Sequence, residues 1–228
     1  MVLGAQRSGT TLVATALAAH PAIALLMEER RGGLFRIAGG KMPAVKLCTP
    51  SQVDLDRRWR AIYQLGRRIG WVARNFDYRM PRSRLSLRDM AARAELKAVC
   101  LIREPSASLA ALRRRENRSD RIGRDILRRT YDIFERLTDE PRIEPQILSF
   151  DRFVRDPKTQ LGRLCDWLDL PFDSAMLDAP RLNPFYPAET FRVEKAAPPP
   201  RPGPRSGQAD PELAGLRARY EALLACAL

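Results

Sequence analysis

Apolar residues along the chain follow two patterns: short continuous runs, and longer stretches in which they recur every three or four positions. The short runs predict buried strands at residues 1–3, 42–48, 96–102 and 144–150. The longer stretches predict helices at about 10–19, 53–69, 86–95, 121–137, 158–168 and 211–225, and a further helix that begins near residue 106. Strands that alternate with helices over long crossovers predict an α/β fold, here a three-layer sandwich with a central parallel sheet.

The length of the chain bounds its domain organisation. At 228 residues it is expected to form one domain over 1–228 with a substantial core. Within that domain, prolines and glycines predict a loop or linker at 196–207, and a closing helix is expected within 209–228. No apolar run approaches the roughly 20 residues of a membrane span, so we expect no membrane association and predict a cytoplasmic protein.

Charge and cysteine content narrow the kinds of ligand. The formal net charge of +13 suits a polyanionic ligand, either a nucleotide with separated phosphates or a nucleic acid. The four cysteines stand far apart and the chain has a single histidine, so neither a metal site nor a disulfide framework is expected.

The most informative stretch is residues 2–18, where a short apolar run leads through a glycine-containing loop into a helix. This order makes backbone N–H groups and a helix N-terminus converge on one point, which is where a phosphate binds. The spacing from Gly4 to Gly9 matches that of the nucleotide P-loop, but Thr10 stands where that loop has its lysine. The cation is Arg7, inside the loop. Such a loop suits one phosphate that carries one transferable group better than it suits a triphosphate.

A second anion site is predicted where the strand at 96–102 ends in Arg103. Glu104 and Pro105 follow, and a helix begins near Ser106. A strand that ends in arginine and opens a helix again directs a cation and helix N–H groups at an anion.

These two segments resemble the donor-binding elements of sulfotransferases that use 3′-phosphoadenosine 5′-phosphosulfate (PAPS). Residues 4–12, Gly-Ala-Gln-Arg-Ser-Gly-Thr-Thr-Leu, resemble the 5′-phosphosulfate loop, and residues 101–108 resemble the 3′-phosphate element. The resemblance covers about residues 2–172, includes the Asp-Pro segment at 146–157, and implies a P-loop-like sulfotransferase fold of bacterial type. The family has a serine where this chain has Ala111, and Ser108, one turn earlier, is the candidate replacement. The donor-binding residues implied are Gln6, Arg7, Ser8, Gly9, Thr10, Thr11, Arg103 and Ser108.

The resemblance also implies catalytic residues. One branch of the family uses a histidine in a segment where this chain has Cys48, and a neutral thiol is a poor base. Another branch has His-Pro and then a glutamate base, which His20, Pro21 and Glu28 match, with Glu29 left open as the alternative. Lys46 matches a lysine that approaches the bridging oxygen. The catalytic set implied is thus Glu28, Arg7 and Lys46, while His20 itself is expected to be structural.

Three functions are compatible with these residues. The first is a metal-independent sulfotransferase that moves a sulfonate from PAPS to a hydroxyl of a small-molecule acceptor. The second is a catalytically idle basic module that binds a nucleotide or a nucleic acid, although charge runs such as 67–84 are more often solvated faces than nucleic-acid sites. The third, a phosphotransferase, is disfavoured by Thr10. We therefore expect an enzyme with a small-molecule partner rather than a nucleic acid.

Overall fold

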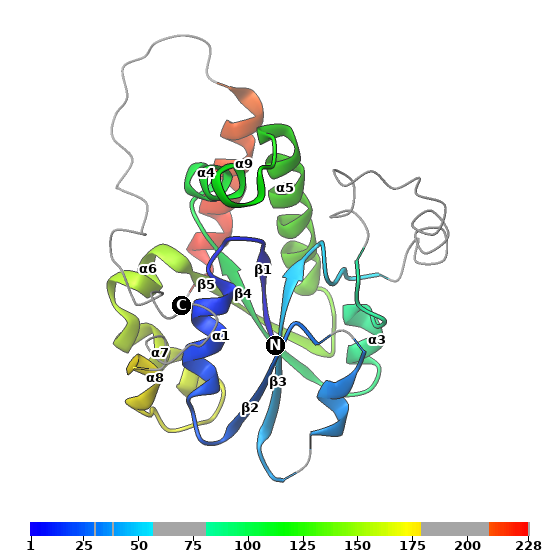
Figure 1. Ribbon diagram of the computed structural model, residues 1–228, viewed down its shortest axis with the longest axis vertical. Helices are drawn as coiled ribbons and strands as arrows, with labels where there is room; N and C mark the ends of the chain where they lie inside the picture. Colours follow the sequence, from blue (N-terminus) through cyan, green and yellow to red (C-terminus); the bar gives the residue numbers. More distant parts are fainter. Residues whose placement is uncertain (30, 38, 57–80, 179–209, 228) are drawn as a thin grey trace.

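The computed structural model describes residues 1–29, 31–37, 39–56, 81–178 and 210–227 (Figure 1). Over these residues the chain forms a five-stranded sheet with helices on both faces, which confirms the predicted three-layer α/β architecture. The predicted loop at 196–207 lies outside the described residues, as does most of the predicted helix at 53–69. Residues 53–56, which are described, are not helical.

The strands are all parallel and stand in the order β2-β3-β1-β4-β5. Four correspond to predicted runs, while β2 forms from an apolar segment that we did not predict as a strand. It is an edge strand with only its first residue buried, so its pattern is weaker than that of the others. The five strands are β1 (Val2–Ala5), β2 (Ile23–Met27), β3 (Met42–Thr49), β4 (Leu96–Ile102) and β5 (Ile143–Ser149).

Alternate side chains of each central strand point into two separate cores. In β1, Leu3 belongs to one hydrophobic cluster and Val2 to the other. One face is covered by α1 (Thr10–Ala18), α6 (Phe150–Arg155), α7 (Pro157–Trp167) and α8 (Ala175–Asp178). The other face is covered by the 3₁₀ helix η1 (Gly33–Arg36), α3 (Leu87–Ala91), α4 (Pro105–Glu116), α5 (Asp120–Leu137) and α9 (Pro211–Ala225).

Local sequence signals explain where several helices begin. Ser86 caps α3 in a capping box with Asp89, as its position before the helix predicted. Glu104 caps α4, and Pro105 occupies the first turn, where its missing N–H costs nothing. The segment directly after β5 forms the helix α6, which we did not predict. Ser149 accepts a hydrogen bond from the backbone N–H of Arg152 and so caps it.

The closing helix α9 lies where it was predicted and packs against α4, α5 and β5. Arg219 pairs with Asp132 and Glu135 of α5, and Arg124 pairs with Asp210 and Glu212 at the start of α9. Ion pairs as exposed as these contribute little each, so most of the docking energy comes from the apolar contacts of α9.

The connections out of β1 and β4 lead in opposite directions. From β1 the chain continues to β2, at one edge of the sheet, and from β4 it continues to β5, at the opposite edge. In the sheet itself β1 and β4 are neighbours. The carboxyl ends of these two strands therefore form the topological switch point, where open α/β sheets bind their ligands. No described helix has both the length and the apolar character needed to cross a membrane.

Candidate functional site

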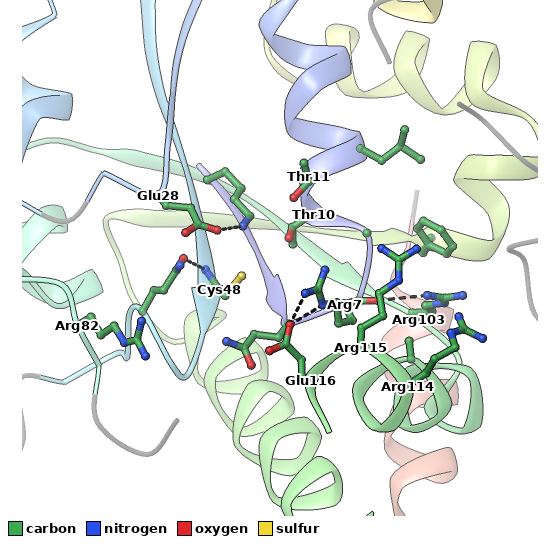
Figure 2. Close-up of a pocket in the computed structure, with 17 residues that line it drawn as sticks. Arg7, Thr10, Thr11, Glu28, Cys48, Arg82, Arg103, Arg114, Arg115 and Glu116 are labelled. Carbon is green, nitrogen blue, oxygen red and sulfur yellow. Dashed lines mark hydrogen bonds and ion pairs between the residues drawn. The ribbon is translucent and has the colours of Figure 1, made fainter. Parts of the chain in front are cut away.

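A pocket of about 300 Å³ lies at this switch point (Figure 2). Because parallel strands all end at the same edge, residues at the end of each of the five strands reach it. The lining residues that come from or directly follow β1 to β5 are Gln6, Arg7, Glu28, Lys46, Cys48, Arg103 and Phe150, and those from helices and neighbouring turns are Gly9, Thr10, Thr11, Leu12, Gln52, Arg82, Ala111, Arg114, Arg115 and Glu116.

The loop between β1 and α1 depends on its two glycines. A Cβ at Gly4 would lie 2.7 Å from Ser8 Oγ and from Thr10 Cγ2, so the loop could not fold back over the end of β1. Gly9 has a φ of 102° and contributes no side chain to cap α1. The first N–H groups of a helix have no partner within it, so the N-terminus of α1 is a place where an anion is stabilised.

Five of the six loop residues that we predicted to bind the donor line the pocket. Gln6, Arg7, Gly9, Thr10 and Thr11 do so. Ser8 does not, because it is buried and its hydroxyl donates to the carbonyl oxygen of Ala5 at 2.8 Å. Its side chain therefore closes the loop, and only its backbone N–H group could take part in binding, although that group itself donates to Ala5 at 3.2 Å.

Arg7 adopts the left-handed backbone conformation, with φ at 67°. Its guanidinium turns to the end of α4, where Nε donates to Glu116 Oε1 at 2.7 Å and Nη2 contacts the same oxygen (Figure 2). Sequence reasoning did not identify Glu116, since it lies 109 positions away and follows a run of arginines. The cation of the loop is thus paired with a carboxylate inside the pocket.

Arg103 joins the second predicted anion site to the loop. Its Nη1 donates to the carbonyl oxygen of Arg7 at 3.2 Å, and its guanidinium lies 4.6 Å above the ring of Phe150. The same ring faces Gly9, where a Cβ would lie 2.2 Å from it. The two segments that resemble donor-binding elements therefore meet in one pocket, in contact through Arg7, Phe150 and Gly9.

The placement of Ser108 does not favour the role we expected for it. Its side chain is 1% exposed, does not line the pocket, and directs its hydroxyl at the carbonyl oxygen of Arg103. Ala111 lines the pocket in the position where the family has its serine. Arg114 and Arg115, three and four residues further along α4, share that helical face and also line the pocket. These two arginines, one turn later, place positive charge on the side of the pocket where Ala111 offers no polar group.

Glu28 and Lys46 form the other charged pair of the pocket. Lys46 Nζ donates to Glu28 Oε1 at 2.7 Å, with Lys46 3% exposed and the Glu28 side chain 47% exposed. The backbone N–H of Glu28 also donates to the carbonyl oxygen of Lys46 at 3.0 Å. Burial opposes the charge on Lys46, but the hydrogen bond to Glu28 and the negative charge of that carboxylate raise the pKa of the ammonium. Lys46 is therefore a fixed, buried cation, and Glu28 is a carboxylate open to the pocket.

Glu29, the alternative to Glu28, has a different role. It does not line the pocket and instead accepts hydrogen bonds from the backbone N–H groups of Arg31, Gly32 and Gly33, at 2.6, 2.9 and 2.8 Å. Desolvation acts to raise the pKa of Glu29, but these three backbone donors and Arg36 lower it. Glu29 thus holds the turn that enters η1, and of these two carboxylates Glu28 is the one that lines the pocket.

The single histidine and the pocket cysteine are poor candidates for bases. His20 is buried, its Nδ1 accepts from the backbone N–H of Ala22 at 3.1 Å, and its Nε2 lies 2.8 Å from the carbonyl oxygen of Pro171. Its role is structural, as expected. Burial raises the pKa of the Cys48 thiol, so this group is a neutral thiol near neutral pH.

The described lining residues include six cations and two carboxylates. The cations are Arg7, Lys46, Arg82, Arg103, Arg114 and Arg115, and the carboxylates are Glu28 and Glu116. Such a pocket attracts a ligand with several negative charges. In the described part of the chain no group of three or more His, Cys, Asp or Glu side chains is arranged to hold a metal ion.

Gly9 provides a test of the loop geometry. Replacing Gly9 with alanine forces a Cβ against Phe150 at a backbone conformation that alanine disfavours, so we expect Gly9→Ala to lower the free energy of unfolding by about 1–3 kcal/mol. Gly162 in α7 is the matched control, because a Cβ there meets nothing within 4 Å, and Gly162→Ala should raise stability by about 0.5–1 kcal/mol. Urea unfolding measures both. Equal stabilities of Gly9→Ala and wild type would contradict the loop geometry.

Comparison with known proteins identifies the fold. No protein-family model matches the chain, and no curated protein matches it in sequence. Among solved structures, a sulfotransferase domain from the curacin biosynthetic pathway is similar with a TM-score of 0.55 and 14% identity, over 96% of each chain. A sulfotransferase domain from the Synechococcus PCC 7002 olefin synthase is similar with a TM-score of 0.51 and 19% identity, over 96% of this chain and 93% of the other. The chain therefore has the fold of these sulfotransferase domains.

Proposed function

We propose that the chain is a sulfotransferase that transfers a sulfonate group from PAPS to a hydroxyl of a small-molecule acceptor. The observation that carries this proposal is the convergence of the glycine loop, Arg103 and the Glu28–Lys46 pair on one pocket of a sulfotransferase-like fold. A nucleotide with phosphate groups at its 5′ and 3′ positions needs two separate anion sites, and an alcohol acceptor needs a base beside the first of them.

The donor would span the pocket between these two anion sites. Its 5′-phosphate would lie at the N-terminus of α1, against the N–H groups of Gly9, Thr10 and Thr11. Its 3′-phosphate would lie near Arg103, with Arg114 or Arg115 supplying a further charge on the exposed side of the pocket. The charge of the pocket matches that of a donor whose negative groups are several ångströms apart.

The transfer itself breaks one sulfur–oxygen bond and forms another. Glu28 accepts the proton of the acceptor hydroxyl while the hydroxyl oxygen attacks sulfur. The bond between sulfur and the oxygen of the 5′-phosphate breaks, leaving adenosine 3′,5′-bisphosphate and a sulfate monoester. Lys46 and Arg7 stabilise the negative charge that grows on the leaving oxygen.

The pairing of Lys46 with Glu28 is compatible with both roles. An ammonium group has three donors, so Lys46 can hold the Glu28 carboxylate and still donate to a leaving oxygen. Because Lys46 is buried at 3% exposure, it is fixed in the pocket wall, whereas the more exposed Glu28 faces the side from which an acceptor enters. Transfer to an alcohol of this kind calls for no metal ion.

Nucleotide binding provides the first test of this proposal. We expect adenosine 3′,5′-bisphosphate to bind at least about tenfold more tightly than AMP, because a charge-assisted hydrogen bond to the 3′-phosphate is worth ~1.5–3 kcal/mol. Calorimetry measures both affinities. In Arg103→Ala the ratio should fall toward one, with only the part of the preference due to Arg114 or Arg115 remaining. A general distortion of the loop through Arg7 would instead weaken both nucleotides equally and leave the ratio unchanged. Stronger binding of ATP or of a short single-stranded oligonucleotide would favour a phosphotransferase or a nucleic-acid-binding module.

Glu28 provides the second test. We expect Glu28→Gln to lower turnover by about 10²–10⁴-fold, the usual contribution of a general base, with nucleotide affinity and stability nearly unchanged. The amide oxygen still accepts from Lys46, so the pocket wall keeps its hydrogen bond. Glu221→Gln, on the exposed surface of α9, is the control for the loss of one carboxylate. Full turnover in Glu28→Gln would exclude a carboxylate base at this position.

Glu116 provides the third test. Its carboxylate competes with an anionic ligand for Arg7, so Glu116→Gln should bind adenosine 3′,5′-bisphosphate more tightly, by up to about fivefold, since a partly exposed ion pair contributes ~0–1 kcal/mol. Glu135→Gln is the matched control, because Glu135 pairs with an arginine outside the pocket. Isothermal titration measures the change. Weaker binding by Glu116→Gln would mean instead that Glu116 holds Arg7 in its binding position.

A further inference from the structure

The wall of the pocket beside Glu28 and Cys48 contains N–H groups that can donate hydrogen bonds to a ligand. In the proposed arrangement the nucleotide PAPS does not contact them. Gln52 and Arg82 line this wall. Figure 2 shows Arg82 on the same side as Glu28 and Cys48, with Arg114 and Arg115 across the pocket. An acceptor whose hydroxyl reaches Glu28 would place its neighbouring groups against this wall.

The amide of Gln52 is held in one orientation. Its side chain is 7% exposed, and its Oε1 accepts from the backbone N–H of Cys48 at 2.7 Å. A backbone N–H can only donate, so the oxygen of the amide must face it and the assignment of oxygen and nitrogen is settled by chemistry. What Gln52 has left for a ligand is its Nε2 group, a donor at the pocket wall for which the described part of the chain shows no hydrogen-bond partner.

Backbone hydrogen bonds fix Arg82 beside Gln52. The N–H of Arg82 donates to the carbonyl oxygen of Ser51 at 3.3 Å, and the N–H of Ser83 donates to that of Gln52 at 2.7 Å. The segment that carries Arg82 is thus docked on the turn that carries Gln52. Arg82 is an exposed residue that lines the pocket, and its guanidinium has five N–H donors, so it can contact a ligand while keeping other partners.

We propose that Gln52 and Arg82 bind a carboxylate of the acceptor, so that the acceptor class is a hydroxy acid. This proposal rests on the proposed function, because it assigns the loop and Arg103 to the donor and Glu28 to the acceptor hydroxyl. Both groups are donors, so their ligand must be an acceptor of hydrogen bonds. The planar fork of a guanidinium matches a carboxylate with two parallel N–H···O bonds, and the Gln52 amide adds a donor on the buried side. An alcohol without an anionic group would offer this wall neither the charge nor the paired oxygens that the two side chains suit.

The test is a binding experiment that needs no knowledge of the natural acceptor. The full chain is saturated with adenosine 3′,5′-bisphosphate and titrated calorimetrically with glycolate, glycerate and mandelate, and with the methyl ester of each; the same titrations are made without nucleotide. At least one acid should bind about tenfold more tightly than its ester, the usual effect of a charge-assisted pair. In Arg82→Ala that preference should disappear while the affinity of the ester and that of the nucleotide stay unchanged.

Two further variants complete the test. Arg84→Ala removes the same charge from the same segment, but Arg84 does not line the pocket, so the preference for the acid should persist. Gln52→Glu keeps an oxygen for the N–H of Cys48 and replaces the donor with a negative charge, so it should abolish acid binding and spare the ester.

Several results would overturn the proposal. One is equal binding of every acid and its ester. Another is a preference for the acid that Arg82→Ala leaves intact. A third comes from titrating glycerol phosphate in the same way: it would bind more tightly than glycerate and lose that affinity in Arg82→Ala. Weaker nucleotide binding by Arg82→Ala would place Arg82 in the donor site instead. Failure of adenosine 3′,5′-bisphosphate to bind at all would contradict the proposed function, and this outcome is separate, because the titrations without nucleotide still report on the carboxylate site.

Discussion

The contact between Gly9 and the ring of Phe150 is the constraint on which the arrangement of the site depends. With no side chain at Gly9, the loop after β1 approaches Phe150 more closely than any Cβ would allow. The same ring supports Arg103, which in turn donates to the carbonyl oxygen of Arg7 in the loop. The ends of β1, β4 and β5 are thereby joined at one edge of the sheet. The two segments predicted to bind anions, almost a hundred residues apart in sequence, are thereby held in a fixed relative position.

This arrangement concentrates positive charge, and the chain offsets part of it internally. Glu116 pairs with Arg7 and Glu28 pairs with Lys46, while the arginines of α4 remain at the exposed side. A ligand with several negative charges gains from the cations that these two carboxylates do not offset. In the proposed function the two carboxylates have different roles: Glu116 would compete with the ligand for Arg7, and Glu28 would accept the proton of the acceptor.

The sequence predicts the parts of this site that depend on local order. The glycine loop, Arg103 after a continuous apolar run, and Glu28 each directly follow a strand, and parallel strands bring those ends to one edge. Lys46 lies inside β3, opposite the last residue of β2. It could not predict contacts made across long separations, such as that of Arg7 with Glu116. The behaviour of Ser108 was equally out of reach, because it lies one turn closer to the start of α4 than Ala111, where its hydroxyl turns to the carbonyl oxygen of Arg103 instead of to the pocket. The edge strand β2 and the short helix α6 were missed because their patterns are weak or brief.

The proposed function requires that the carboxyl edge of this sheet bind a nucleotide phosphorylated at both its 3′ and 5′ positions. A crystal structure of the protein with adenosine 3′,5′-bisphosphate tests that requirement most directly. We expect the 5′-phosphate on the N–H groups of Gly9, Thr10 and Thr11, and the 3′-phosphate within hydrogen-bond distance of Arg103. A nucleotide bound away from this edge, or with its 3′-phosphate in the loop and its 5′-phosphate at Arg103, would contradict the proposed function.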